Sequence, residues 1–237
     1  VLFVEPGMNW KAHVKRWVAP SVLNETLLRL PLLYRTPLVR YETNLQENRG
    51  VEDLLAQLAL ALPFEGDIIE CGSSRCGGSV LMALAVRAAG EKKTILACDS
   101  FEGFDRSEWR TERERGLTTA REDAFTSTSY GYVVRKLRVL GVDDLVKPVR
   151  GYFVDTLPHL AGPWCFALVD CDLMQSILYC AEQLWPKIVP GGRIVFDDYT
   201  CADFRGARLG IEEFVRRCGP EIAEHGLLRR LYFARKR

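Results

Sequence analysis

Four acidic residues, placed where two short apolar runs end, are the residues of this chain best suited to chemistry. They are Asp170, Asp172, Asp197 and Asp198. The apolar runs before them, residues 166–169 and 193–196, read as neighbouring strands. Carboxylates gathered at two strand ends repel one another unless a cation or a proton lies between them. Because all-oxygen donors favour Mg²⁺, with Mn²⁺ or Ca²⁺ as substitutes, the sequence predicts a divalent-cation site and disfavours structural zinc.

The spacing within the first acidic pair indicates different roles for its two acids. Side chains two residues apart on a strand point to the same side, so Asp170 and Asp172 are expected to face one cleft. We expect Asp170 to share the cation with Asp197 and Asp198, and Asp172 to stand further toward the opening. The alternative, in which these acids only cap helices after the strands, accounts for one or two of them but not for all four.

The histidines do not supply an obvious general base. His13, His159 and His225 are scattered, and none lies in an acidic or glycine-rich motif. A carboxylate is therefore the expected proton acceptor. Ser176, which follows the first acidic pair, is expected to be the N-cap of the next helix and not a nucleophile.

A glycine-containing segment, residues 70–79, connects an expected strand at 67–71 to a helix. It lacks the GxGxxG spacing of dinucleotide-binding loops and has instead Glu70-x-Gly72 followed by a polar bend, a pattern associated with S-adenosylmethionine. Glu70 is expected to orient the amino-acid end of that cofactor. Further candidate contacts on the segment are Gly72, Ser73 and Ser79. The simpler alternative is a glycine-rich turn that holds no ligand.

Two further strand ends complete the candidate cofactor site. Asp99 ends an expected strand at 94–99, where a carboxylate can accept hydrogen bonds from both ribose hydroxyls, and Ser100 follows it. A solvated acid at a strand end is the alternative. Gly151 and Tyr152, at the end of the third strand, are expected to contact an adenine ring.

Strands and helices alternate along most of the chain, which is typical of a parallel, doubly wound α/β sheet with helices on both faces. Strands are expected at 67–71, 94–99, 146–153, 166–170 and 193–196, and helices at 77–89, 130–140 and 176–188. A last strand at 227–235, after a turn at 224–226, is expected to form an antiparallel hairpin. Residues 1–63 read as a helical cap with its clearest helix at 51–62, and residues 64–237 as the main domain. A polar stretch at about 104–130 is either a solvated helix or a lid over the site.

Composition limits the cellular setting and the partners. At 237 residues with a net charge of +1, the chain suits one sizeable α/β domain and has no global charge that would attract nucleic acid or a membrane. No apolar stretch approaches the roughly 20 residues of a spanning helix. The eight cysteines lack CxxC spacing and lie largely in apolar runs, which predicts reduced thiols in a cytoplasmic protein. We expect a homo-oligomer, with a dimer formed through the N-terminal helices, although these helices would equally suit acceptor recognition.

The assembled motifs resemble the macrocin O-methyltransferase family from about residue 54 to the C-terminus. The segments that carry the resemblance are 66–72, 99–103, 151–158, 170–172 and 190–199. The family uses S-adenosylmethionine and Mg²⁺ to methylate sugar hydroxyls of antibiotics. The resemblance implies a Rossmann-like class I methyltransferase fold with a mostly parallel, seven-stranded sheet and an antiparallel C-terminal strand.

The same resemblance implies a role for each motif residue. The metal ligands are Asp170, Asp197 and Asp198, and the general base is Asp172. Cofactor contacts are implied near Glu70, Gly72, Asp99 and Ser100. The expected acceptor is a hydroxyl of a small-molecule natural product, a sugar or polyketide moiety.

Two other functions stay open at this point. A nucleotide-dependent oxidoreductase uses a similar sheet. A catalytically inactive methyltransferase-like scaffold is the second, since Met174 and Gln175 depart from the family pattern.

Overall fold

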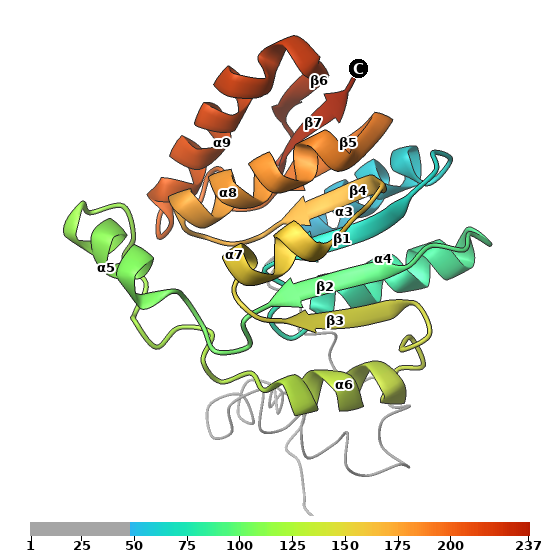
Figure 1. Ribbon diagram of the computed structural model, residues 1–237, viewed down its shortest axis with the longest axis horizontal. Coiled ribbons are helices and arrows are strands. Elements are labelled where there is room, and N and C mark those ends of the chain that lie inside the picture. Colours follow the sequence, from blue (N-terminus) through green and yellow to red (C-terminus); the bar gives the residue numbers. More distant parts are fainter. Residues whose placement is uncertain (1–47) are drawn as a thin grey trace, which may run out of the picture. The chain divides into compact units, whose positions relative to one another are not determined.

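A computed structural model describes residues 48–237, and its centre is a seven-stranded sheet (Figure 1). The strand order is β3-β2-β1-β4-β5-β7-β6. Neighbouring strands from β3 to β5 pair in parallel, whereas β7 pairs antiparallel with both β5 and β6. The strands are β1 (Asp67–Cys71), β2 (Ile95–Asp99), β3 (Val146–Arg150), β4 (Trp164–Val169), β5 (Ile188–Phe196), β6 (Ile222–Leu227) and β7 (Tyr232–Lys236). This is the expected mostly parallel sheet with an antiparallel C-terminal strand.

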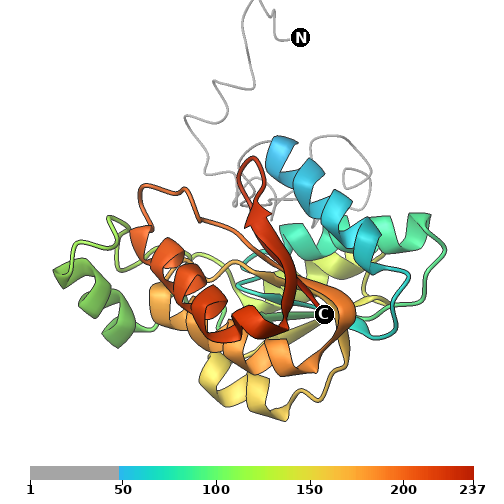
Figure 2. The same cartoon turned by 90° about the horizontal axis from the view of Figure 1, so that it is seen from above.

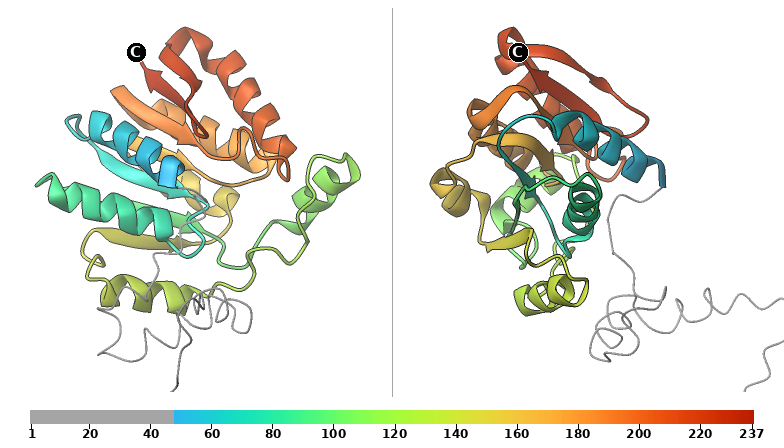
Figure 3. Two further views of the ribbon diagram at one scale, coloured as in Figure 1. Left: turned by 180° about the vertical axis from the view of Figure 1, so that it is seen from behind. Right: turned by 90° about the vertical axis from the view of Figure 1, so that its right-hand side faces the viewer.

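Helices cover both faces of the sheet (Figures 2 and 3). On one face lie α3 (Asn48–Ala61) and α4 (Gly77–Ala88), and on the other lie α7 (Phe153–Thr156), α8 (Met174–Leu184) and α9 (Arg205–Cys218). Helix α6 (Tyr130–Val139) packs against the edge strand β3. Helix α5 (Arg106–Glu114) stands beyond the carboxyl ends of the parallel strands (Figure 1).

The central strands form the core because they are apolar on both faces. Every residue of β4 is buried, as are four of the five residues of β1. Strands of a parallel sheet are sandwiched between helices, so a continuous apolar run is stable there and an alternating one is not needed. All eight cysteines are unpaired thiols, and six of them are buried. No helix among residues 48–237 is long and apolar enough to cross a membrane.

The C-terminal hairpin exists, but its predicted turn is wrong. The turn lies at residues 228–231, where the Leu228 amide donates to the Leu231 carbonyl at 2.8 Å. The segment expected to turn, residues 224–226, pairs with β7 as part of β6. Its polar residues fit there because β6 is an edge strand with one partner and an exposed side.

Two other boundaries differ from expectation near the candidate site. The third strand ends at Arg150, and the residues after Tyr152 form the short helix α7. Helix α8 begins at Met174, so its N-cap residue is Leu173 and Ser176 lies inside the first turn. The helix predicted at 51–62 is confirmed as α3. The remainder of the predicted N-terminal cap, residues 1–47, lies outside the described residues.

Candidate active site

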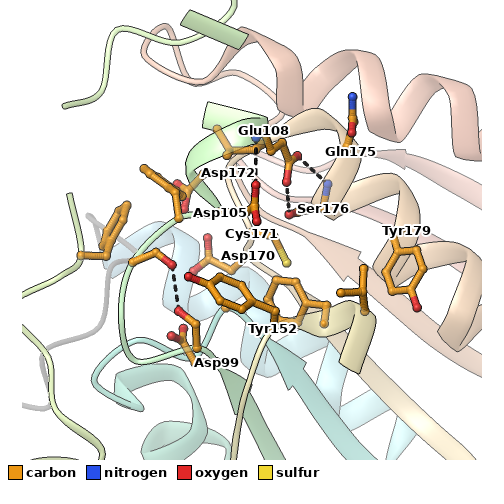
Figure 4. Close-up of a pocket in the computed structure, with 18 of the residues that line it drawn as sticks. Asp99, Asp105, Glu108, Tyr152, Asp170, Cys171, Asp172, Gln175, Ser176 and Tyr179 are labelled. Atoms are coloured by element: carbon orange, nitrogen blue, oxygen red, sulfur yellow. Dashed lines mark hydrogen bonds between the residues drawn. The ribbon is translucent and has the colours of Figure 1, made fainter. Parts of the chain in front are cut away.

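A cavity of about 350 Å³ opens at the carboxyl edge of the sheet, between the ends of β1, β2 and β4 and helix α5 (Figure 4). Its floor includes Gly72, Asp99 and Asp170, each at or just beyond a strand end. This edge is where ligands bind in doubly wound folds, because the loops that leave the strands diverge there. The cavity is of the size that small-molecule sites have.

Two carboxylates that line this cavity, Asp170 and Asp172, belong to a cluster of three. Oxygens of Asp170, Asp172 and Asp198 all lie within 4.8 Å of one another. The ends of β1, β4 and β5 hold them together, since the Asp170 amide donates to the Cys71 carbonyl at 2.8 Å and the Asp197 amide donates to the Val169 carbonyl at 3.1 Å. Acids of two separate segments, expected from the sequence to lie together, therefore meet in one cluster, which holds Asp170, Asp172 and Asp198 but not Asp197.

The backbone at two of these acids is unusual. Asp172 has φ +64° and Asp198 has φ +60°, a left-handed conformation that is uncommon for residues other than glycine. Such conformations persist when the surrounding structure enforces them, and they concentrate at functional sites.

The electrostatics of the cluster suit a cation. Burial raises the pKa of Asp170 well above its usual value, and Asp197 and Asp198 raise it further. Burial also raises the pKa of Asp172, with Asp198 and Asp170 adding to the effect. Burial raises the pKa of Asp198 to about 6, again with a neighbouring aspartate contributing. A hard divalent cation would remove this repulsion, and a set of carboxylate oxygens is its preferred donor type, so the residues fit Mg²⁺.

Asp197 is close to the cluster but has its own partner. Its carboxylate accepts hydrogen bonds from Arg230, at 2.9 Å from Nε, and from the Asp198 amide, at 2.8 Å. Arg230 also lies 3.4 Å from Asp198 Oδ1. Asp197 is still close enough to raise the pKa of Asp170. Of the predicted ligands, Asp170 and Asp198 join Asp172 in the cluster, while Asp197 lies beside it in an ion pair.

The predicted ribose contact, Asp99, lines the same cavity as Asp170 and Asp172 (Figure 4). Its two oxygens accept from the amides of Ser74 at 2.8 Å and Phe101 at 2.6 Å. A carboxylate has about four acceptor positions, so these bonds orient Asp99 and leave capacity for hydroxyl groups. These free acceptor positions fit the ribose hydroxyls of S-adenosylmethionine.

Gly72 allows the loop after β1 to lie directly against the acidic cluster. Its φ is +87°, and a Cβ there would overlap the backbone carbonyl of Asp170. The glycine is therefore needed for the close approach of the loops after β1 and β4.

Some of the other predicted cofactor residues line the cavity and some do not. Ser100 and Tyr152 line the cavity together with Gly72 and Asp99. The remaining candidates are not among the lining residues, namely Glu70, Ser73, Ser79 and Gly151. Glu70 is 2% exposed and accepts a hydrogen bond from Ser79 Oγ, and burial raises its pKa to about 8. This hydrogen bond connects β1 to the first turn of α4, at the two ends of the glycine loop.

Comparison with known proteins agrees with this geometry. The sequence profile of the macrocin-O-methyltransferase (TylF) family matches residues 50–219. The chain belongs to the macrocin O-methyltransferase family.

Two curated relatives from Streptomyces are moderately similar. The 8-demethyl-8-(2,3-dimethoxy-alpha-L-rhamnosyl)-tetracenomycin-C 4'-O-methyltransferase of Streptomyces olivaceus is 31% identical over 176 residues, covering 66% of this chain and 64% of that protein. The demethyldecarbamoylnovobiocin O-methyltransferase of Streptomyces niveus is 32% identical over 138 residues, covering 56% and 53%. The chain thus spans less than two thirds of the length of these relatives.

A solved structure shares the fold. The O-methyltransferase NovP superposes with a TM-score of 0.71 at 21% identity, covering 92% of this chain and 99% of NovP. At that identity the similarity shows the architecture alone.

Several residues at the site of this macrocin O-methyltransferase family member were not predicted from the sequence. Arg230 reaches the acidic cluster from the turn between β6 and β7, a position that the misplaced turn concealed. Glu108 and Glu112 of α5 bond to the first turn of α8. Their spacing of four residues places them on one helix face, but the surrounding charged residues hid that signal.

Proposed function

We propose that this protein is a metal-dependent O-methyltransferase that moves a methyl group from S-adenosylmethionine to a hydroxyl of a small-molecule natural product, a sugar or polyketide moiety. The observation that carries the proposal is the group of three carboxylates within 4.8 Å of one another, two of which, Asp170 and Asp172, line the same cavity as Asp99. Family membership supports the reaction class. The acceptor class follows from the relatives, which are named for methyl transfer to a rhamnosyl-tetracenomycin and to a demethyldecarbamoylnovobiocin.

The proposed mechanism divides the site in two. Asp99 and Ser100, with the loop at Gly72, would hold the cofactor, which supplies the methyl group. Asp170, Asp197 and Asp198 would hold Mg²⁺, or Mn²⁺ in its place. A bound cation of this kind lowers the pKa of an acceptor hydroxyl and fixes its orientation.

The remaining steps belong to the chain itself. The carboxylate of Asp172 accepts the hydroxyl proton, which frees the acceptor oxygen to take the methyl group as the carbon–sulfur bond of the cofactor breaks and S-adenosylhomocysteine leaves. Phe104, Phe125 and Tyr179 give the cavity aromatic walls, which exclude water and pack against the apolar part of an acceptor. In the same proposal, residues 64–237 form the methyltransferase domain, residues 1–63 form a helical cap, and the protein is a dimer.

Asp197 allows a test of the ligand assignment. If Asp197 leaves Arg230 to bind the cation, Asp197→Asn should weaken Mn²⁺ binding by roughly 10–100-fold, the worth of one charged contact. Calorimetric titration measures this affinity, and Asp143→Asn, at an exposed position far from the cavity, is the control. An affinity equal to that of the wild type would make Asp172 the third ligand and would leave Asp197 as the partner of Arg230.

The overall function is tested by a methyl-transfer screen. Labelled S-adenosylmethionine is offered with glycosides, polyketides and phenols, with Mg²⁺ or with EDTA. We expect transfer to a glycoside or polyketide that EDTA abolishes and Mg²⁺ restores. Tight binding of NAD without binding of S-adenosylmethionine would favour an oxidoreductase, and binding of neither cofactor would favour a scaffold.

A further inference from the structure

Helix α8 begins directly after the loop that carries Asp170 and Asp172, yet it has no cap of its own. Its N-cap residue is Leu173, which offers no side-chain hydrogen bond. The first amides of a helix lack partners within the helix, and an uncapped start frays or relies on groups from elsewhere.

The missing cap comes from α5, more than sixty residues away in the sequence. Glu112 accepts a hydrogen bond from the Met174 amide. Glu108, one turn earlier, accepts from the Ser176 amide at 2.7 Å and from Ser176 Oγ at 2.6 Å (Figure 4). Two carboxylates of α5 therefore occupy the N-terminus of α8, where the partial positive charge of a helix favours anions.

The carboxylate of Glu112 also contacts a second helix. Helix α9 starts at Arg205, and its N-cap residue, Phe204, likewise provides no side-chain bond. A Cβ on Gly206 would lie 2.8 Å from Cδ of Glu112, so the glycine leaves room for the carboxylate against the first turn of α9. The segment after α5 is fixed at the same place, because the Thr119 amide donates to the Asp203 carbonyl at 3.0 Å.

Stability alone does not explain a glutamate at this position. Glu112 is 2% exposed, and its Oε2 has no hydrogen-bond partner among the described residues. Burial raises its pKa to about 7, and the neighbouring Glu108 raises it further, while the Met174 amide and Arg115 lower it. A serine or aspartate at position 173 would cap α8 at lower cost in desolvation.

The loop that Glu112 anchors is the part of the site under strain. At its first end the Asp170 amide is fixed to the Cys71 carbonyl. Between its ends, Asp172 has φ +64°. The Leu173 amide donates across Asp172 to the Cys171 carbonyl at 2.6 Å, and Met174, held by Glu112, is the second flank of this turn.

We propose that Glu112 is a positioning residue, whose carboxylate joins α5 to the N-termini of α8 and α9 and thereby fixes the loop that carries Asp170 and Asp172. Docking of α5 beside the cavity and assembly of the acidic cluster are then one event. The inference rests on the proposed function for its catalytic consequence, but the anchoring itself does not depend on that function.

Two variants of the full chain test the proposal by different routes. Glu112→Ala removes the carboxylate. Gly206→Ala leaves the carboxylate in place but fills its space with a methyl group, in a helix where alanine is otherwise favoured. The controls are Glu114→Ala, at an exposed position on the same helix, and Gly131→Ala, which is also the second residue of its helix and has open space around it.

Trypsin measures the anchoring without any need for activity. We expect cleavage after Arg110, Arg113 or Arg115 to be about fivefold faster in both test variants, the change expected from the loss of one helix cap, and unchanged in both controls. Wild-type cleavage rates in Glu112→Ala and Gly206→Ala would contradict the proposal that Glu112 holds α5 against α8 and α9, whether or not the protein transfers methyl groups.

Cation binding and kinetics measure the positioning. We expect both test variants to bind Mn²⁺ less tightly and to lose about fivefold in kcat. The KM for S-adenosylmethionine should not change, because Asp99, the expected cofactor contact, lies at the end of β2 and not in the loop that Glu112 holds. Faster trypsin cleavage with wild-type Mn²⁺ affinity and wild-type kcat would overturn the positioning role. A failure of the proposed function is distinguishable, because it would appear in the wild type as an absence of methyl transfer. Glu112→Gln, which keeps the shape of the side chain, replaces Glu112→Ala if the latter does not fold.

Discussion

Replacing Asp172 by asparagine should lower kcat for methyl transfer by roughly 100–10,000-fold, the usual contribution of a general base. Asparagine keeps the shape of the side chain and its neighbours Asp170 and Asp198, but it has no carboxylate to accept the hydroxyl proton. Cofactor affinity should stay the same, because Asp99 lies at the end of a different strand. Single-turnover kinetics with labelled S-adenosylmethionine measure the chemical step directly.

The comparison with cation binding separates a base from a ligand. We expect Asp172→Asn to bind Mn²⁺ within about threefold of the wild-type affinity, less than the loss of one charged contact. Parallel losses of activity and Mn²⁺ affinity would identify Asp172 as a ligand, in agreement with its place in the three-carboxylate cluster. Transfer at an undiminished rate would show that another group removes the proton.

Replacing Asp170 by asparagine should have opposite effects on stability with and without the cation. In EDTA the variant should melt at a temperature about 2–8 °C higher than the wild type, if removal of a buried charge among like charges gains about 1–2 kcal/mol. An asparagine amide can also donate to the neighbouring carboxylates. Burial raises the pKa of Asp170, and Asp197 and Asp198 raise it further, which is why loss of its charge should stabilise the protein without a cation.

With excess Mg²⁺ the order should reverse. The wild type gains about 2.7 kcal/mol at a cation concentration one hundred times Kd, and the variant should gain little. Differential scanning fluorimetry in EDTA and in a Mg²⁺ series measures both melting temperatures, with Asp143→Asn as the control. An Asp170→Asn variant that melts below the wild type in EDTA, or that gains as much from Mg²⁺, would contradict a cation site at Asp170.

The fold was predictable because its strands are local and strongly patterned. The continuous apolar run at residues 164–169 is typical of a central parallel strand, and β4 is one. The acids at strand ends were equally visible, since the end of a strand predicts which edge of the sheet a residue joins. Their meeting required only that strands β4 and β5 be neighbours.

The rest depends on contacts between distant segments, which local patterns do not encode. Ser176 has the chemistry of an N-cap, yet the cap comes from Glu108 and Glu112 in a segment whose charges resemble those of a solvated helix. The contact of Arg230 with the acidic cluster was not predicted, because the turn was expected at 224–226 and not at 228–231, where Arg230 lies. A turn displaced by a few residues moves every side chain near it to a different neighbour.

The close approach at Gly72 has a consequence for how the proposed enzyme can change its acceptor. The loop at Gly72 and the loop at Asp170 touch through main-chain atoms, so their separation is set by backbone that side-chain substitutions barely alter. The cavity walls have no such constraint, since Phe104, Phe125 and Tyr179 come from other segments. Relatives with different acceptors would therefore differ in their walls and share one floor, and redesign for a new acceptor should begin at the walls.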